Sequence, residues 1–162
     1  MNYNIREIDE KELEECASII REGFMTVAEE FGITRENVPT NGAFLQKERL
    51  LEERAKGHIM YAVVLGTKII GYMQLEKSTT ELYFLQKLVV VPSYRHLGIG
   101  KALLDFVKAK VTEWEGSKIS IGIIEENTVL KNWYLSYGFV TTTTRKFEHL
   151  PFTVGFMELK LI

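Results

Sequence analysis

Cysteine, proline and long apolar runs are all scarce in this sequence of 162 residues. Its single cysteine, Cys16, excludes an internal disulfide and a zinc site built on several cysteines. Three prolines in a chain that is 46% hydrophobic exclude a disordered tail or a collagen-like repeat. The longest apolar runs, 61–65 and 88–91, are far shorter than the roughly 18 residues that cross a bilayer. We therefore expect one soluble domain over residues 1–162, long enough to bury a core of its own.

An excess of charge of one sign is also missing. Twenty basic and 22 acidic residues give a net charge of −2 at pH 7. No basic block of the kind that contacts nucleic-acid phosphates is present, so we predict no nucleic-acid partner and no membrane partner. The first fifteen residues, MNYNIREIDEKELEE, lack the apolar segment of a signal peptide. We expect a cytoplasmic protein whose Cys16 is a buried structural thiol.

The apolar pattern predicts a mixed α/β domain with the element order β-α-α-β-β-β-α-β-α-β-β. Asp9 and Glu12 resemble a helix cap, and the first helix is expected to be continuous or broken near Gly23 or Gly32. Helices are predicted at 10–30, 42–55, 98–114 and 127–137. Strands are predicted at 3–8, 59–65, 69–76, 82–91, 119–123, 139–147 and 153–161. The three strands from 59 to 91 form an antiparallel meander, and the sheet is expected to become parallel around 82–124.

The segment from Arg95 to Ala102 lies between a buried strand and an amphipathic helix. Glycines at a helix start let the backbone approach a ligand, and the free N–H groups there attract an anion such as phosphate. The alternative is a glycine turn that only connects the two elements. A dinucleotide fingerprint is excluded because Leu103 stands where glycine or alanine is needed. A P-loop is excluded because Arg95 and Ala102 replace its glycine and its Ser or Thr.

The same segment resembles the signature of the GCN5-related N-acetyltransferases, [Q/R]-x-x-G-x-[G/A] after a strand, which is matched by Arg95, Gly98 and Gly100. A second signature of that family, an Asn before a short helix that carries Tyr and closes with Gly-Phe, is matched by Asn127, Tyr134, Gly138 and Phe139. The element order resembles the family order over essentially the whole chain. The resemblance implies a single domain with a mostly antiparallel sheet and one splayed parallel strand pair.

The resemblance further implies an acyltransferase that passes an acetyl group directly from acetyl-CoA, its co-substrate, to a primary amine of a small molecule or peptide. The amides of 96–101 would bind the pyrophosphate, and the backbone of 88–90 would pair with the pantetheine arm like an added strand. The residues implied for coenzyme A are Leu88, Val89, Val90, Arg95, His96, Leu97, Gly98, Ile99, Gly100, Lys101 and Asn127.

Catalytic roles follow from the same resemblance. Backbone N–H groups around Val89 would stabilise the oxyanion, and Tyr134 would protonate the leaving thiolate. The general base stays open, since the central strand carries no carboxylate near the expected site. Glu125 or Glu126 is favoured, a water relay is equally plausible, and Glu76 and Glu81 are interpreted as surface carboxylates flanking a hairpin.

Acceptor recognition is expected in the 24–44 segment and the 147–153 loop, with Phe31 and His149 as the named contacts. His58, His96 and His149 have no metal-ligand spacing, so no metal is predicted. An acyl-CoA-binding sensor of the same fold is the alternative to an enzyme. The resemblance also favours a homodimer over a monomer.

Overall fold

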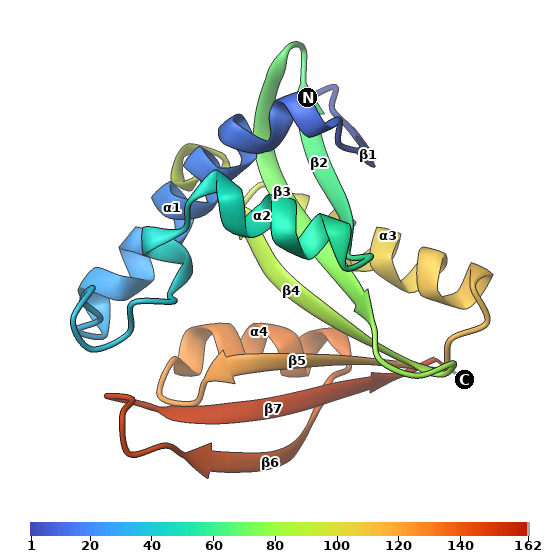
Figure 1. The fold of residues 1–162 in the computed structure, drawn as a ribbon. Helices are drawn as coiled ribbons and strands as arrows, with labels where there is room; N and C mark the ends of the chain where they lie inside the picture. Colours follow the sequence, from blue (N-terminus) through green and yellow to red (C-terminus); the bar gives the residue numbers. More distant parts are fainter. Residues whose placement is uncertain (162) are drawn as a thin grey trace.

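A computed structural model describes residues 1–161 and has the predicted order of elements (Figure 1). The strands are β1 (Asn4–Glu7), β2 (Ile59–Leu65), β3 (Lys68–Lys77), β4 (Leu82–Val90), β5 (Lys118–Ile124), β6 (Val140–Lys146) and β7 (Thr153–Lys160). The α-helices are α1 (Leu13–Glu30), α2 (Lys47–Ala55), α3 (Ile99–Glu113) and α4 (Thr128–Tyr137), with short 3-10 turns at Glu10–Glu12, Gly42–Phe44 and Pro92–Tyr94.

One seven-stranded sheet runs through the domain in the order β1-β2-β3-β4-β5-β7-β6. Every neighbouring pair is antiparallel except β4 and β5, which are parallel. That pair is hydrogen-bonded only from Leu82–Phe84 to Lys118–Ser120, and beyond it the two strands diverge (Figure 1). The predicted switch from antiparallel to parallel pairing around 82–124 is therefore confirmed.

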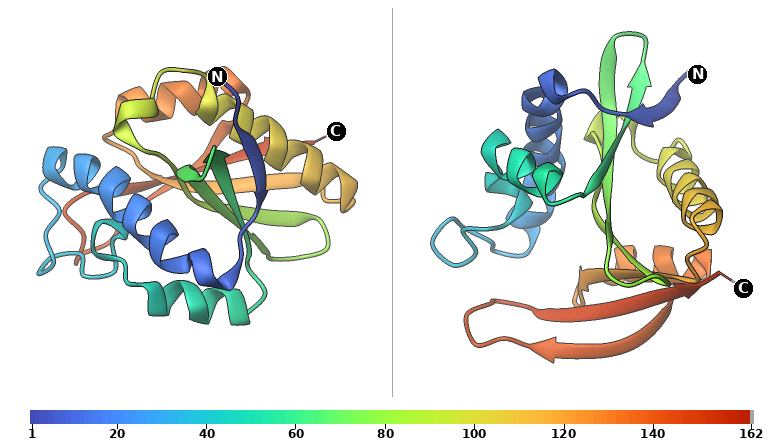
Figure 2. Two further views of the ribbon diagram at one scale, coloured as in Figure 1. Left: turned by 90° about the horizontal axis from the view of Figure 1, so that it is seen from above. Right: turned by 45° about the vertical axis from the view of Figure 1, so that its right-hand side comes forward.

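Helices cover both faces of the sheet. Figure 2 shows α1 and α2 on one face of the β2–β4 meander and α3 on the other. The core between these layers is apolar and almost closed to solvent, with Leu13, Ile20, Leu50, Ile70, Met73, Leu103 and Val107 among its members. Cys16 belongs to this core, where burial raises the pKa of its thiol to about 12, so the prediction of a buried structural thiol is confirmed.

One predicted helix boundary was wrong, the start of α2, whereas the first helix is the continuous one of the two alternatives. Helix α1 continues through Gly23 without a break and ends at Glu30, just before Gly32 at φ 66. Helix α2 begins at Lys47 rather than 42, because Gly42–Phe44 forms a separate 3-10 turn. The side chain of Asn41 accepts the N–H of Ala43 at 2.9 Å and starts that turn. Within residues 1–161, no helix has the length and apolar character that a membrane-crossing segment needs.

Candidate functional site

The gap between β4 and β5 opens toward the carboxyl ends of both strands, and α3 and α4 begin at that end (Figure 1). Parallel strands that part in this way leave a crevice in which α/β proteins commonly bind ligands. The N-termini of both helices present positive dipole ends, and the amides of α3 before Ala102 have no helical partner. The topology thus places two anion-attracting helix starts at the mouth of one crevice.

The start of α3 has the backbone shape that the glycine motif predicts. Gly98 caps the helix at φ 84, a conformation that side chains disfavour. The first bond of the helix runs from the N–H of Ala102 to the carbonyl of Gly98, so the amides before Ala102 are free of helical partners. A Cβ on Gly100 would lie 3.0 Å from the Trp133 ring, which shows how closely α4 approaches.

Arg95, which the resemblance places near the pyrophosphate, makes three side-chain hydrogen bonds at the end of β4. Its guanidinium donates to the carbonyls of Val90 and Gly23 at 3.1 Å each and to the Thr26 hydroxyl at 3.1 Å. Arg95 therefore ties α1 to the end of β4. Asn127 similarly caps α4, its side chain accepting the N–H of Leu130 at 3.2 Å.

A β-bulge distorts β4 where it leaves β5. Tyr72 pairs with Val89 but Gln74 pairs with Gln86, so β4 holds one residue more than β3 across this interval. Lys87 lies in the bulge at φ 54, in the left-handed region. The strand is thereby turned, and its edge toward β5 has no pairing partner beyond Phe84.

Tyr134 packs on the inner side of α4. Its ring makes edge contacts with Trp133 and Phe139 at centroid distances of 4.9 and 5.2 Å, and the residue is 6% exposed. Burial raises the pKa of its phenol well above the ordinary value of 10. Tyr134 therefore carries its proton at neutral pH and is chemically able to donate it.

A polar network lies between α2 and the sheet, and sequence reasoning missed it. The fully buried Gln74 accepts from the Tyr72 hydroxyl at 2.8 Å, while its amide nitrogen lies 2.9 Å from Glu53 Oε1 and 2.8 Å from His58 Nδ1. Lys87 Nζ lies 2.7 Å from the same Glu53 oxygen. Although burial disfavours its charge, the hydrogen bonds from Lys87 and Gln74 lower the pKa of Glu53. The sequence feature that could have indicated this network is the presence of polar side chains, Gln74 and Lys87, in otherwise apolar strands.

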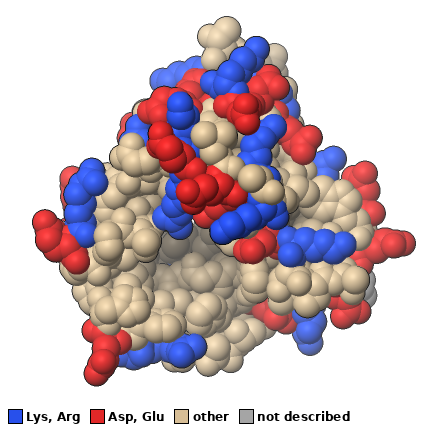
Figure 3. Space-filling view, in the orientation of Figure 1, with Lys and Arg blue, Asp and Glu red and all other residues tan. Residues whose placement is uncertain are grey.

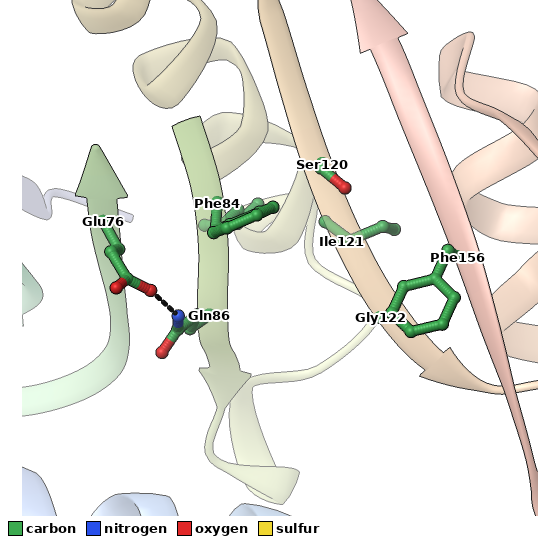
Figure 4. A pocket seen from close by; sticks show the side chains of 8 residues that line it. Glu76, Phe84, Gln86, Ser120, Ile121, Gly122 and Phe156 are labelled. Atoms are coloured by element: carbon green, nitrogen blue, oxygen red, sulfur yellow. Dashed lines mark hydrogen bonds between the residues drawn. The ribbon is translucent and has the colours of Figure 1, made fainter. Parts of the chain in front are cut away.

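A cavity of about 320 Å³ opens beside this network, at the point where β4 and β5 begin to part (Figure 4). In the cavity wall, Gln86 donates to Glu76 at 2.7 Å. Figure 3 shows a hollow on this face, below α2 and floored largely by uncharged residues. The lining residues are Glu76, Phe84, Leu85, Gln86, Ser120, Ile121, Gly122 and Phe156.

The two carboxylates favoured as general base are held by neighbouring elements. Glu125 forms an ion pair with Lys131 of α4, and its other oxygen is buried against Gly155 without a partner among the described residues. Glu126 accepts the N–H of Thr153 at 3.0 Å. Both side chains therefore lie at the end of β5, where each already contacts a neighbouring group of the protein.

The two segments predicted to recognise the acceptor do meet. Phe31 packs on a small apolar cluster of α1 and the following loop, and Leu150 and Phe152 from the β6–β7 loop pack on the same cluster. His149 lies in that loop, exposed, with its ring 5.9 Å from Phe147.

Comparison with known proteins gives matches over nearly the whole chain. The family model described as acetyltransferase (GNAT) domain matches residues 32–161. A curated relative, an uncharacterized N-acetyltransferase in the pepI 3′ region of Lactobacillus delbrueckii subsp. lactis, is 29% identical over 164 residues. That match covers 93% of this chain and 89% of the relative.

Solved structures show the same fold. The ribosomal-protein-S18-alanine N-acetyltransferase of Escherichia coli matches with a TM-score of 0.79 at 14% identity, over 99% of this chain and 94% of that one. The PaiA N-acetyltransferase of Thermoplasma acidophilum, in complex with coenzyme A, matches with a TM-score of 0.79 at 21% identity and 99% coverage of both chains. YncA of Salmonella typhimurium, solved with acetyl-CoA, matches with a TM-score of 0.73 at 18% identity, over 100% of this chain and 95% of that one. The expected fold class is confirmed.

Proposed function

The chain belongs to the GNAT acetyltransferase family, and we propose that it transfers the acetyl group of acetyl-CoA directly to a primary amine of a small molecule or peptide. The observation that supports this proposal most directly is the splayed parallel pair β4–β5, which has two helix N-termini at its open end. Two of the similar solved structures contain coenzyme A or acetyl-CoA. A cytoplasmic location and a homodimer remain predictions from the sequence.

The cofactor is proposed to lie along the unpaired edge of β4. Its pyrophosphate binds the free amides at the start of α3, where Gly98 faces open space. The pantetheine arm then pairs with the backbone of 88–90 as an added strand. The side chain of Val89 packs on Gly23 of α1. The contact that β4 offers to the pantetheine arm is therefore its backbone at 88–90. The thioester arrives next to the bulge, where an N–H of the strand stabilises the oxyanion.

The chemistry requires a neutral amine and a protonated acid. The amine nitrogen attacks the thioester carbonyl, the carbon–sulfur bond breaks, and the thiolate of coenzyme A leaves. Tyr134 donates its proton to that sulfur, a contribution of about 10²–10⁴-fold in general acid catalysis. Burial raises the pKa of this phenol, so Tyr134 holds its proton at neutral pH and gives it up only to the charge that develops on the departing sulfur. Glu125 stays a prediction as the base, with Phe31 and His149 as predicted acceptor contacts.

The test is acetyl-CoA binding measured as a rise in thermal stability. A ligand that binds only the folded protein at 100 times its Kd adds about 2.7 kcal/mol of stability. Gly98→Leu should abolish the rise, since its side chain would fill the anion site. Gly57→Leu is the matched control. Both glycines have positive φ, 84 and 98, and a Cβ added at either would meet no atom within 4 Å, yet only Gly98 lies at the start of α3.

A wild-type protein that gains no stability from acetyl-CoA would overturn the proposal, and so would a Gly98→Leu variant that still gains it. A second measurement separates an enzyme from an acyl-CoA sensor. Thiol release that depends on an added amine supports the enzyme, whereas binding without any such release across an acceptor panel supports the sensor.

A further inference from the structure

Within the proposed function, on which this inference rests, we propose that Glu76, and not Glu125, binds the ammonium group of the acceptor and takes its proton. The acceptor is a small primary amine with a compact apolar body. His58 and Gln86 are positioning residues that hold the carboxylate of Glu76.

Glu76 is the single charged residue among those that line the 320 Å³ cavity. The rest of the wall is mostly apolar, with Phe84 on β4, Ile121 on β5 and Phe156 on β7 (Figure 4). A cavity near the lower end of the size range for small-molecule sites, with one charge on an apolar wall, suits a small amphipathic cation. The carboxylate supplies the charge that orients such a molecule.

The cavity also lies where the reaction would take place. It is lined by Leu85 and Gln86, directly before the bulge at Lys87. A cofactor that enters at the α3 start and runs along β4 toward the β4–β5 junction brings its acyl end to this point. An amine held at Glu76 is then on the α2 side of the sheet, opposite the helices that hold the cofactor (Figure 2).

Hydrogen bonds fix the carboxylate and the tautomer of its neighbour. Gln74 accepts from Tyr72 through its oxygen, so its nitrogen donates both hydrogens, one to Glu53 Oε1 and one to His58 Nδ1. Since Nδ1 accepts, the neutral His58 carries its hydrogen on Nε2, which lies 3.5 Å from Glu76 Oε2. Gln86 donates to Glu76 Oε1 at 2.7 Å. His58 and Gln86 hold the carboxylate of Glu76 from two sides. The Glu76 side chain is still 41% exposed, so lone pairs of its oxygens are open to a substrate.

The other charged groups around Glu76 converge on Glu53. Lys87 and Arg49 both contact Glu53, at 2.7 and 3.4 Å, and burial lowers the pKa of Lys87 while Glu53 opposes that effect. Among the described residues, Glu76 has no Lys or Arg within ion-pair distance, in contrast to Glu125, which pairs with Lys131.

The proton balance is complete. Glu76 accepts one proton from the R–NH₃⁺ acceptor, which frees the nitrogen lone pair for attack, and later releases that proton to solvent through its exposed side. The nitrogen loses its second proton after attack, and this proton replaces the one that Tyr134 gives to the thiolate. The products are the N-acetyl amide, the thiol form of coenzyme A and one released proton.

The experiment compares two amines in wild type and in Glu76→Gln. 2-Phenylethylamine is a cation at neutral pH, whereas 2,2,2-trifluoroethylamine is largely neutral there and needs no base to become nucleophilic. We expect Glu76→Gln to lower kcat/KM for 2-phenylethylamine by about 10²–10⁴-fold and to change it for trifluoroethylamine by less than about tenfold. Acetyl-CoA binding, measured by thermal shift, should be unchanged. Glu81→Gln is the control, because Glu81 is an exposed carboxylate on the same hairpin.

The role of His58 is tested by the pH profile. His58→Leu removes the donor to Glu76 and should shift the acidic limb of kcat/KM for 2-phenylethylamine, whereas His58→Gln, which restores an N–H, should move it back. A fold defect alone would lower the rate at all pH values without moving the limb.

Four results overturn one proposal or the other. Equal kcat/KM of Glu76→Gln and wild type with 2-phenylethylamine overturns the role of Glu76, and so does an equal loss with both amines. Wild type that binds acetyl-CoA yet releases no thiol with either amine overturns the amine class assigned to this cavity. Wild type that does not bind acetyl-CoA overturns the proposed function itself.

Discussion

Replacing Gly23 by alanine should destabilise the protein, although alanine is the better helix former. Gly23 lies in the middle of α1, where the exchange alone would stabilise by about 0.8–1.0 kcal/mol. A Cβ at this position, however, would lie 2.0 Å from Val89 Cγ2 on β4. Carbon atoms in contact are ordinarily about 3.5–4.0 Å apart. Helix and strand would therefore have to separate by well over an ångström, or Val89 would have to leave its rotamer.

Neither movement is easy at this site. Val89 is 6% exposed and β-branched, so its χ1 is stiff. Arg95 also ties α1 to the end of β4 through Gly23, Thr26 and Val90. Overpacking of this kind costs about 1–3 kcal/mol. After the gain in helix propensity, we expect a net loss of up to about 2 kcal/mol in the free energy of unfolding.

A double-mutant cycle in urea unfolding tests the reasoning. Val89→Ala alone should destabilise by roughly 2 kcal/mol through lost burial and a residual cavity. In that background the clash is gone, so Gly23→Ala should change sign and stabilise by about 1 kcal/mol. If Gly23→Ala stabilises the wild-type protein as well, the close α1–β4 contact does not limit this position and the reasoning fails.

Three further predictions concern catalysis and pH. Tyr134→Phe should lower kcat while the Kd for acetyl-CoA is nearly unchanged, as measured by thiol release and calorimetry; undiminished turnover would leave Tyr134 a packing residue. Phe31→Ala and His149→Ala should raise the acceptor KM and leave the Kd for acetyl-CoA within about twofold, which is under roughly 0.5 kcal/mol; the reverse pattern would mean that the two ends of the site are exchanged. Glu12 has its pKa lowered from 4.5 to about 2, chiefly by the Arg6 side chain. Its ion pair therefore contributes stability above pH 4.5 that is lost as the pH falls toward 2, so thermal melts of Glu12→Gln should depend less on pH across this window than those of wild type.

The parts of the fold that the sequence predicts well are those with local causes. The stripe of Leu13, Cys16 and Ile20 specifies a helix whatever it packs on, and these residues are buried as expected. The glycines at 98 and 100 stand at a helix start because the motif needs that backbone shape. Of the two alternatives at Gly23, a break or a continuous helix, the structure has the continuous helix, because this glycine makes room for Val89 of β4 and does not end α1.

The candidate site was harder to predict because its contacts are distant in sequence. Gln74 and Lys87 reach Glu53 across 21 and 34 residues, and no pattern along either strand indicates that partner. An acidic residue beside a hairpin, such as Glu76, has the sequence pattern of a surface carboxylate. Only the bulge in β4 and the packing of α2 bring His58 and Gln86 to it.

The strand order has a consequence for how the chain is assembled. β7, the last strand, lies between β5 and β6, and β6 is paired with β7 alone. During synthesis β5 therefore keeps one edge open, and β6 has no partner, until residues 153–160 have left the ribosome. The wall that β7 contributes to the crevice can form only after residues 153–160 have been synthesised. Until then the exposed strand edges are open to pairing with other chains, so nascent chains arrested after β6 should be the species most prone to aggregate.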